Sequence, residues 1–401
     1  MFSSSEEITN LERTYLVQNY ARYPLVLREG KGCYVYDVDG KKYLDLISGI
    51  GVNALGYAHP RITKVIREQA GRLVHTSNLY YNEYQARLAE RLAGITGLAR
   101  SFFCNSGAEA IETALKIARA HGNARSSEKH EVVALEGSFH GRTLGAISVT
   151  GEEKYRRDFQ PLLPGARFIR RSDVQALEGA VTGNTACIIL ELIQGESGIR
   201  PVSEPFARRA RELADRNDAL LVFDEIQCGL GRTGVRFAYQ RFDPIVQPDV
   251  VVTAKPIACG IPLGATIASE RAAASLKLTT HGSTYGGGPL ACRVALEFLE
   301  LMDELLPSIR TAGVYFRTRL EDLKKRFGFI KEVRGEGLML AMELEISCKP
   351  LVLDGIAEGA LFNCTHETTL RFLPPYIIGK REIDQAIKKL TKIFKKVKPA
   401  A

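Results

Sequence analysis

The stretch VVTAKPIACG (residues 251–260) ends a run of mostly β-branched residues in a lysine, and a proline follows at once. The apolar run predicts a buried strand. A lysine at the end of such a strand is costly unless it is solvated, paired or used chemically. Lys255 is therefore the first candidate for a functional residue.

Three other short apolar runs resemble this one, and helical patterns separate them. They are HEVVALEG (130–137), ACIILELIQG (186–195) and ALLVFDEIQ (219–227). This alternation predicts an α/β fold with a central, mostly parallel sheet that helices cover on both faces. Ligands bind such sheets at the carboxyl ends of the strands. We therefore expect Glu191, Asp224 and Lys255, which close three of the runs, to face one crevice.

The two ends of the chain have different patterns. Residues 32–46, GCYVYDVDGKKYLDL, alternate around DVDG and predict a hairpin, whereas residues 290–306 predict a long helix. A chain of 401 residues is long enough for two domains. We expect residues 61–295 to form the large domain, and residues 1–60 and 296–401 to form a smaller α+β domain.

The composition is that of a soluble globular protein, with 45% hydrophobic and 25% charged residues. The sequence has no apolar run near 18 residues and no secretory signal pattern, which predicts a cytoplasmic protein without a membrane partner. The net charge of +8 is concentrated in KKLTKIFKKVK (388–398). This segment predicts the solvated face of an amphipathic helix, and we expect no nucleic-acid partner.

The eight cysteines are scattered singly, and no CxxC pair occurs. This pattern predicts reduced, mostly buried thiols. It argues against a metal site and against a disulfide framework.

The segment SFFCNSGAEAIETALKIARAHG (101–122) predicts a strand that leads into a helix. Ser106 is a suitable N-cap residue, and Glu109 three positions later completes a capping-box pattern. The N–H groups and the dipole at a helix N-terminus suit a phosphate, and Gly107 would let it approach the backbone. An ordinary capped helix is the alternative interpretation. No GxxxxGK[ST] motif occurs, so nucleotide binding has little support.

The segment GSFHGRTLGAISVTG (137–151) follows a predicted strand with a glycine-flanked turn. Phe139 in this turn could stack on a flat cofactor ring, and Arg142 could bind a carboxylate with its planar guanidinium. A core phenylalanine and a surface arginine are the alternative.

The segment VFDEIQCGLGRTG (222–234) places Asp224 at the end of a buried strand, where an unpaired carboxylate would be costly. A positively charged ring nitrogen would satisfy it, and Gln227 could hydrogen-bond a ring oxygen. A phosphate-binding helix start, an aromatic residue, a buried aspartate and Lys255 together meet the needs of pyridoxal 5'-phosphate. The lysine would hold this cofactor covalently, and the aspartate would keep its ring nitrogen protonated.

Eight motifs in the chain resemble those of the class III, fold-type I pyridoxal-phosphate aminotransferases, and among these the acetylornithine aminotransferases. They are LDLISGIGVNALGYAHP (44–60), NSGAEAIETALKIAR (105–119), FHGRTLGAISVTG (139–151), ELIQGESG (191–198), FDEIQCGLGRTG (223–234), AKPIACGIPLGA (254–265), HGSTYGGGPLAC (281–292) and LRFLPPYII (370–378). The chain differs from the family at Pro256, where glycine is frequent, and at Gly288, where asparagine is common.

The resemblance implies a set of cofactor-binding residues. They are Ser106, Gly107, Ala108, Phe139, Asp224, Gln227, Lys255 and Thr284. Lys255 and Asp224 are the implied catalytic residues. Thr284 would reach the phosphate from the other subunit, which implies a homodimer with shared active sites.

The resemblance also implies a set of substrate-binding residues. They are Asn53, Arg142, Glu196, Ser283 and Arg371. Arg371 would bind the α-carboxylate and Arg142 a carboxylate as well, while Glu196 would pair with Arg371 and release it. Asn53 lies in the segment near the substrate entrance.

The implied reaction is transamination between N2-acetyl-L-ornithine and 2-oxoglutarate in arginine biosynthesis, with small amino acids and 2-oxo acids as substrates. The same cofactor residues suit another ω-amine aminotransferase, acting on ornithine, succinyl-diaminopimelate, 4-aminobutyrate or a carrier-linked lysine precursor. An aminomutase or a decarboxylase is a different reaction class on the same scaffold. An aminomutase would need no 2-oxoglutarate, and Arg142 together with Arg371 argues against it. A non-catalytic binding protein would not need Lys255 and Asp224.

Overall fold

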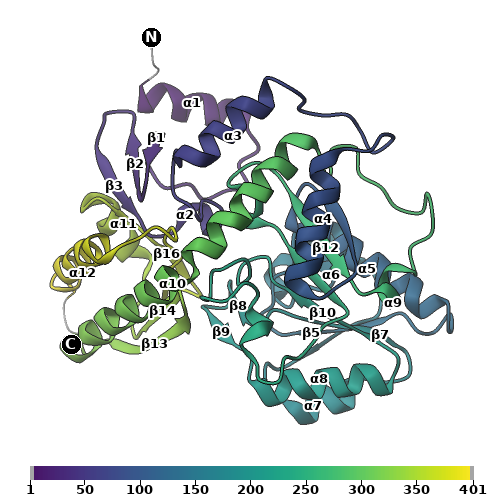
Figure 1. The fold of residues 1–401 in the computed structure, drawn as a ribbon. Coiled ribbons are helices and arrows are strands. Elements are labelled where there is room, and N and C mark those ends of the chain that lie inside the picture. The colour runs from purple at the N-terminus through teal and green to yellow at the C-terminus, as the bar shows by residue number, and fades with distance from the viewer. Residues whose placement is uncertain (1–3, 398–401) are drawn as a thin grey trace.

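The computed structural model describes residues 4–397, so Lys398 of the predicted tail lies outside the described residues. Its centre is a seven-stranded sheet with strand order β4-β12-β11-β10-β7-β5-β6 (Figure 1). The strands are β4 (Arg100–Cys104), β5 (Glu131–Leu135), β6 (Ala166–Ile169), β7 (Thr185–Leu190), β10 (Leu220–Asp224), β11 (Val250–Thr253) and β12 (Gly264–Ala268). Only β12 runs antiparallel to its neighbours. The predicted α/β fold with a mostly parallel sheet is confirmed.

Both faces of this sheet are buried, which explains the continuous apolar runs of the sequence. In β10 and β11, Leu221, Phe223 and Val251 point into one apolar cluster, whereas their neighbours Val222 and Val250 point into another. The first cluster is covered by α4 (Glu83–Thr96), α7 (Val174–Ala180), α8 (Glu204–Arg216) and α10 (Pro289–Arg326). The second cluster is covered by α5 (Gly107–Asn123).

A smaller sheet brings the two ends of the chain together, as Figure 1 shows on the side away from β7. Its strands, in spatial order, are β1 (Leu27–Lys31), β2 (Tyr34–Asp37), β3 (Lys42–Asp45) and β15 (Ala360–Leu361). The antiparallel pair β2–β3 confirms the predicted hairpin. The C-terminal strand β15 pairs in parallel with β3, so both ends of the chain contribute to one sheet.

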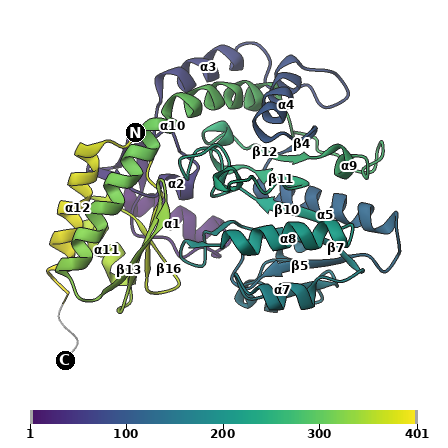
Figure 2. The ribbon, with the colours of Figure 1, turned by 60° about the horizontal axis from the view of Figure 1, so that its bottom comes forward.

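A third sheet is antiparallel and comes entirely from the C-terminal part of the chain (Figure 2). Its strands, in spatial order, are β13 (Ile330–Glu336), β14 (Met339–Leu344), β17 (Thr369–Phe372) and β16 (Asn363–Thr365). β16 is therefore an edge strand. A short ribbon of β8 (Ile193–Gln194) and β9 (Arg200–Pro201) follows the central strand β7.

The remaining α-helices are α1 (Ser5–Tyr15), α2 (Ser48–Gly51), α3 (Pro60–Ala70), α6 (Leu144–Ser148), α9 (Glu270–Ala273), α11 (Lys349–Ala357) and α12 (Lys380–Phe394). The 3-10 helices are η1 (Glu153–Tyr155), η2 (Arg157–Phe159), η3 (Ala238–Arg241) and η4 (Lys255–Ala258). The predicted long helix is α10, which begins at Pro289 and continues past position 295. The domain boundaries at positions 60 and 295 stay predictions.

The C-terminal helix α12 has the predicted amphipathic character. Its buried residues are Ile383, Ala386, Ile387, Leu390, Ile393 and Phe394. Its lysines at 388, 389 and 392 lie outside this buried set. Across residues 4–397, no helix is both long and apolar enough to cross a membrane.

The expectation of reduced thiols is wrong for two cysteines, because Cys348 and Cys364 form a disulfide. Cys348 is the N-cap residue of α11 and Cys364 lies in β16, and the fold brings their Cα atoms to 5.6 Å. This separation suits a disulfide. The sequence offered no signal for it, since the pairing depends on how α11 packs beside β16. The other six cysteines are free, and five of them are buried.

Candidate active site

A cavity of about 430 Å³ lies at the carboxyl ends of the central strands. Glu191 after β7, Asp224 at the end of β10 and Lys255 after β11 all line it. The three strands are parallel neighbours, so their carboxyl ends meet at one edge of the sheet. The prediction that these three residues face one crevice is confirmed.

The Asp224 carboxylate is only 3% exposed and is held from two sides. Its Oδ1 accepts a hydrogen bond from the backbone N–H of Ile226 at 3.0 Å. Its Oδ2 lies 2.7 Å from Nδ1 of His140, which is also buried. An ionised carboxylate only accepts hydrogen bonds, so Nδ1 is the donor. Sequence reasoning gave His140 no role, because it is 84 positions from Asp224 and no motif spacing links them.

Lys255 occupies an unusual backbone conformation. Its φ of 30° lies in the left-handed region, and Pro256 follows it directly. Such a conformation in a non-glycine residue costs about 1–3 kcal/mol and is typical of functional sites. Burial lowers the pKa of the Lys255 amine, although the nearby Glu196 and Asp224 carboxylates oppose this shift. A lysine whose pKa is lowered has a larger fraction of the neutral, nucleophilic amine.

The N-terminus of α5 forms another wall of the cavity, through Ser106, Gly107 and Ala108. Ser106 is the N-cap residue, and its Oγ accepts a hydrogen bond from the backbone N–H of Glu109 at 3.2 Å. The Glu109 carboxylate accepts a hydrogen bond from the backbone N–H of Asn105 at 2.7 Å. In a standard capping box this bond would come from the N–H of the N-cap residue, which is Ser106 here. A Cβ on Gly107 would lie 2.8 Å from Cδ1 of Ile226, so the Ile226 side chain would have to shift to admit a larger residue here.

Glu191 connects two segments that surround the cavity. Its carboxyl accepts hydrogen bonds from the backbone N–H groups of Phe139 at 2.9 Å and Gly195 at 3.2 Å. Burial raises the pKa of Glu191 to about 7, and the nearby Asp224 adds to this effect while His140 opposes it. Phe139 also lines the cavity.

Arg371 lies on β17 and is fully buried. It does not line the cavity itself, but it contacts Gln227, which does. Nη1 of Arg371 donates to Oε1 of Glu196 at 2.6 Å and to Oε1 of Gln227 at 3.3 Å. Burial alone would raise the pKa of Glu196, but the charge and hydrogen bond of Arg371 hold it below its usual value. The structure thus brings together Glu196 and Arg371, which are 175 positions apart in the sequence.

The other predicted substrate-binding residues differ in whether they line the cavity. Arg142 lines it, with its guanidinium 3.8 Å from the ring centroid of Tyr155. Asn53 is outside the lining, where its neighbour Val52 takes part. Ser283 and Thr284 are also outside the lining.

Ser283 is nevertheless linked to the start of α5, because its Oγ accepts a hydrogen bond from Nδ2 of Asn105 at 3.3 Å. Thr284 is exposed. Gly288, one of the two departures from the family pattern, is the N-cap residue of α10.

Glu225 follows Asp224 but does not line the cavity. Its fully buried carboxyl accepts hydrogen bonds from the N–H groups of Ala238 at 2.8 Å and Tyr239 at 2.9 Å. Burial raises its pKa from 4.5 to about 7. The pKa of Glu225 is thus higher in the folded protein, about 7, than in the unfolded chain, 4.5. The contribution of Glu225 to the free energy of unfolding is therefore complete below about pH 4.5 and is lost as the pH rises through 7.

We therefore expect the free energy of unfolding of the wild type, relative to Glu225→Gln, to fall by about 2–3 kcal/mol between pH 5 and 8. Guanidinium chloride unfolding of both proteins at the two pH values measures this difference. A difference that does not change with pH would contradict the raised pKa.

The residues around the cavity fit pyridoxal phosphate. A helix N-terminus suits its phosphate, the buried Asp224 suits a protonated ring nitrogen, and Lys255 lies in the same cavity. Within residues 4–397, no group of three or more His, Cys, Asp and Glu side chains is arranged to hold a metal ion. The fold and this set of side chains define a pyridoxal-phosphate-dependent enzyme of fold-type I.

Comparison with known proteins gives the family. The model of the class III aminotransferases matches residues 15–394. The acetylornithine aminotransferases of Methanocaldococcus jannaschii and Aquifex aeolicus are each 44% identical to the chain, over 98% and 95% of it and 100% of each relative. The chain belongs to the class III aminotransferase family, and it is an aminotransferase that uses pyridoxal phosphate.

Solved structures agree with this assignment. The crystal structure of the ornithine aminotransferase from Toxoplasma gondii has a TM-score of 0.93 at 34% identity, covering 98% of this chain and 95% of that one. The acetylornithine aminotransferase from Elizabethkingia anophelis has a TM-score of 0.87 at 30% identity, covering 99% and 100%.

Proposed function

We propose that the enzyme transfers the terminal amine of N2-acetyl-L-ornithine to 2-oxoglutarate, giving N-acetyl-L-glutamate 5-semialdehyde and L-glutamate, in arginine biosynthesis. The observation that carries this substrate is the 44% identity over nearly the full chain to relatives named acetylornithine aminotransferase. Ornithine is the second candidate, because the structure with a TM-score of 0.93 is an ornithine aminotransferase. A cytoplasmic location stays a prediction.

Lys255 is the proposed proton carrier of the reaction. Pyridoxal phosphate, when bound, supplies an electron sink that stabilises negative charge at the reacting carbon of the substrate. Nζ of Lys255 accepts the proton from the amine-bearing carbon of the donor. In the second half-reaction it returns a proton to the carbon that becomes the amine-bearing carbon of glutamate. Its lowered pKa supports this use, since a general base must be partly unprotonated near neutral pH.

Three further residues are proposed to orient the cofactor. Asp224, fixed by His140, would face the ring nitrogen, and Phe139 would stack on the ring. Gln227 would hydrogen-bond the ring hydroxyl. The support for these roles is their common position around one cavity with Lys255.

Arg371 and Arg142 are proposed to bind the two carboxylates of 2-oxoglutarate and glutamate. N-acetylornithine has one carboxylate and a neutral acyl end, so it leaves one arginine without a partner. The Glu196–Arg371 ion pair at 2.6 Å would then neutralise that arginine. This arrangement would let one site accept two substrates of different charge.

We also propose a homodimer with shared active sites, in which Thr284 reaches the phosphate in the partner's site. Support comes from large apolar side chains that are more than two-thirds exposed: Tyr15, Val17, Tyr20, Leu79, Tyr80, Tyr81, Leu278, Tyr285 and Val314. Leu278 and Tyr285 flank the segment that carries Ser283 and Thr284. Three of these side chains, Leu79, Tyr80 and Tyr81, are consecutive, and contiguous exposed apolar groups favour an interface. A solution mass of a single chain would contradict the dimer.

The donor substrate can be tested with single half-reactions. The cofactor-loaded protein is mixed with N-acetylornithine, ornithine, 4-aminobutyrate or succinyl-diaminopimelate without an acceptor, and loss of the bound cofactor's visible absorption is followed. We expect N-acetylornithine to react at least about 10-fold faster than ornithine, because one unsuitable polar group in a site costs about 1.4 kcal/mol or more.

The matched control is each amine mixed with free pyridoxal phosphate at the same concentration. Faster reaction with ornithine would assign the enzyme to the second candidate. Equal, slow reaction with all four amines would contradict both.

A further inference from the structure

The guanidinium of Arg371 is held at both ends. Its Nη1 donates to Glu196, Gln227 and the backbone oxygen of Gly195, the last at 3.2 Å. At the other end, its Nε donates to Oδ1 of Asn363 at 3.1 Å. The bond at Nε matters because a planar guanidinium anchored at both ends has a defined plane, and bidentate carboxylate binding depends on that plane.

Asn363 faces Arg371 because of strand register. The two residues are direct partners in the antiparallel pair β16–β17. β16 is three residues long and lies at the edge of its sheet, so hydrogen bonds from neighbouring strands hold only one side of it. Short edge strands are weakly held elements. The position of Asn363 therefore needs support from the other side of β16.

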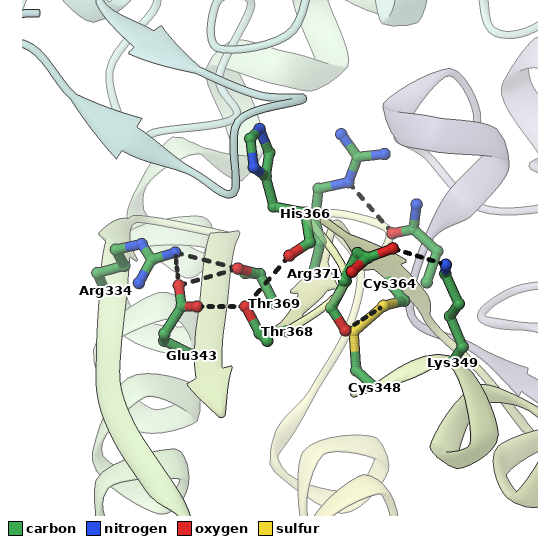
Figure 3. Close-up of a disulfide and its surroundings, with 11 residues drawn as sticks. Arg334, Glu343, Cys348, Lys349, Cys364, His366, Thr368, Thr369 and Arg371 are labelled. Atoms are coloured by element: carbon green, nitrogen blue, oxygen red, sulfur yellow. Dashed lines mark hydrogen bonds and ion pairs between the residues drawn. A yellow bond between two sulfur atoms is a disulfide. The ribbon is translucent and has the colours of Figure 1, made fainter. Parts of the chain in front are cut away.

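The disulfide provides this support. Cys364, the residue after Asn363, is bonded to Cys348 at the start of α11, and Figure 3 shows this bond in one close-up with Arg371. α11 is anchored in the apolar core through Leu351 and Val352. The edge strand is thus attached covalently to a helix that packs on the core.

We propose that Asn363 is a positioning residue for Arg371, and that the Cys348–Cys364 disulfide keeps Asn363 in place. This rests on the proposed function, in which Arg371 binds a substrate carboxylate. When Glu196 leaves Arg371 to admit that carboxylate, Nη1 loses its ion-pair partner. The hydrogen bond from Nε to Asn363 then keeps the guanidinium plane fixed.

Carboxylate binding should consequently respond to a dithiol reductant. Cys364 is partly exposed and Cys348 is buried, so a dithiol thiolate attacks Sγ of Cys364 and releases the Cys348 thiolate, which takes up a proton. The second thiol of the reductant then displaces Cys364. Two protein thiols form, the dithiol becomes a cyclic disulfide, and two electrons pass from it to the protein. β16 then keeps its hydrogen bonds to β17 and its packing beside α11 but loses its covalent attachment.

The test uses the cofactor-loaded enzyme and glutarate, a dicarboxylate without an oxo group or an amine. Calorimetry gives the Kd of glutarate, and steady-state kinetics give KM and kcat for 2-oxoglutarate. We expect Asn363→Ala to raise Kd and KM about 10-fold, the usual effect of one hydrogen bond to a charged group, with kcat within about 2-fold. A dithiol should raise the Kd of the wild type about 3-fold or more. It should have no effect on the variant C348S/C364S, whose Kd should match that of the reduced wild type.

Lys349→Ala is the matched control, because it removes the surface ion pair of Lys349 with Glu367 beside the disulfide and leaves both sulfur atoms in place. It should keep the wild-type Kd with and without the dithiol. Thiol titration of the denatured protein should give six thiols before reduction and eight after it. Eight thiols before reduction would overturn the role of the disulfide. If C348S/C364S does not fold, the dithiol-treated wild type still decides.

Arg371→Ala separates this inference from the proposed function. If Arg371→Ala leaves glutarate binding unchanged, the proposed role of Arg371 is wrong. If Arg371→Ala abolishes binding while Asn363→Ala does not weaken it, only the positioning role is overturned. A wild-type Kd that does not change on reduction, combined with a weakened Asn363→Ala, overturns the contribution of the disulfide.

Discussion

Replacing Lys255 by alanine is expected to lower kcat by at least about 10⁴-fold. No other lysine lines the cavity, so within the described chain no second amine can both hold the cofactor and carry the proton. The cavity itself should persist, because the side chains of Asp224 and Glu191 and the backbone of Phe139 are held by contacts that do not include Lys255. Stopped-flow measurement of the half-reaction with L-glutamate separates a lost chemical step from a lost binding step.

Lys129→Ala is the matched control for this variant. Lys129 is a second buried lysine, 4% exposed, but its Nζ donates to the backbone oxygens of Gly183 and Asn217, and it does not line the cavity. It should lose stability and keep kcat within a few-fold of the wild type. Turnover of Lys255→Ala at more than about 1% of the wild-type rate would contradict the role of Lys255.

The large sheet could be predicted from the sequence because its strands are buried on both faces. Their apolar runs are continuous and end at polar residues, so both the strands and the crevice residues Glu191, Asp224 and Lys255 could be located. The pairing of β15 with β3 was harder to predict, since it joins residues more than 300 positions apart. Such pairings leave no periodic pattern in either segment.

The contacts that support the candidate site could not be predicted in the same way. His140 beside Asp224, Asn363 beside Arg371 and the Cys348–Cys364 bond each depend on packing between elements distant in the chain or on strand register. A local motif identifies residues that would touch a cofactor, because these are concentrated in loops with recognisable glycine patterns. The residues that hold them belong to other elements, and only the folded structure brings the two sets together.

The second large effect is expected for Asp224→Asn, with kcat lowered by about 10³-fold at saturating cofactor. The amide has the shape of the carboxylate, and its single oxygen can still accept the hydrogen bond from the N–H of Ile226, whereas its Nδ2 faces Nδ1 of His140 as a donor, which a neutral imidazole accepts in its other tautomer. The shape of the site is thus kept while the negative charge is lost. The Asp224 side chain is only 3% exposed, so its charge acts in a medium of low dielectric constant. Loss of this charge therefore removes a strong electrostatic stabilisation of a positively charged ring nitrogen.

The test of this effect must separate cofactor loss from rate loss. Bound pyridoxal phosphate is quantified by absorbance after denaturation, and kcat is expressed per bound cofactor. Asp249→Asn is the matched control: this buried aspartate pairs with Arg211 and Arg271 instead and does not line the cavity. It should lose stability but keep kcat per bound cofactor. A fully loaded Asp224→Asn enzyme with wild-type kcat would show that the buried charge is not needed for the chemistry, and would leave Asp224 with a role in binding alone.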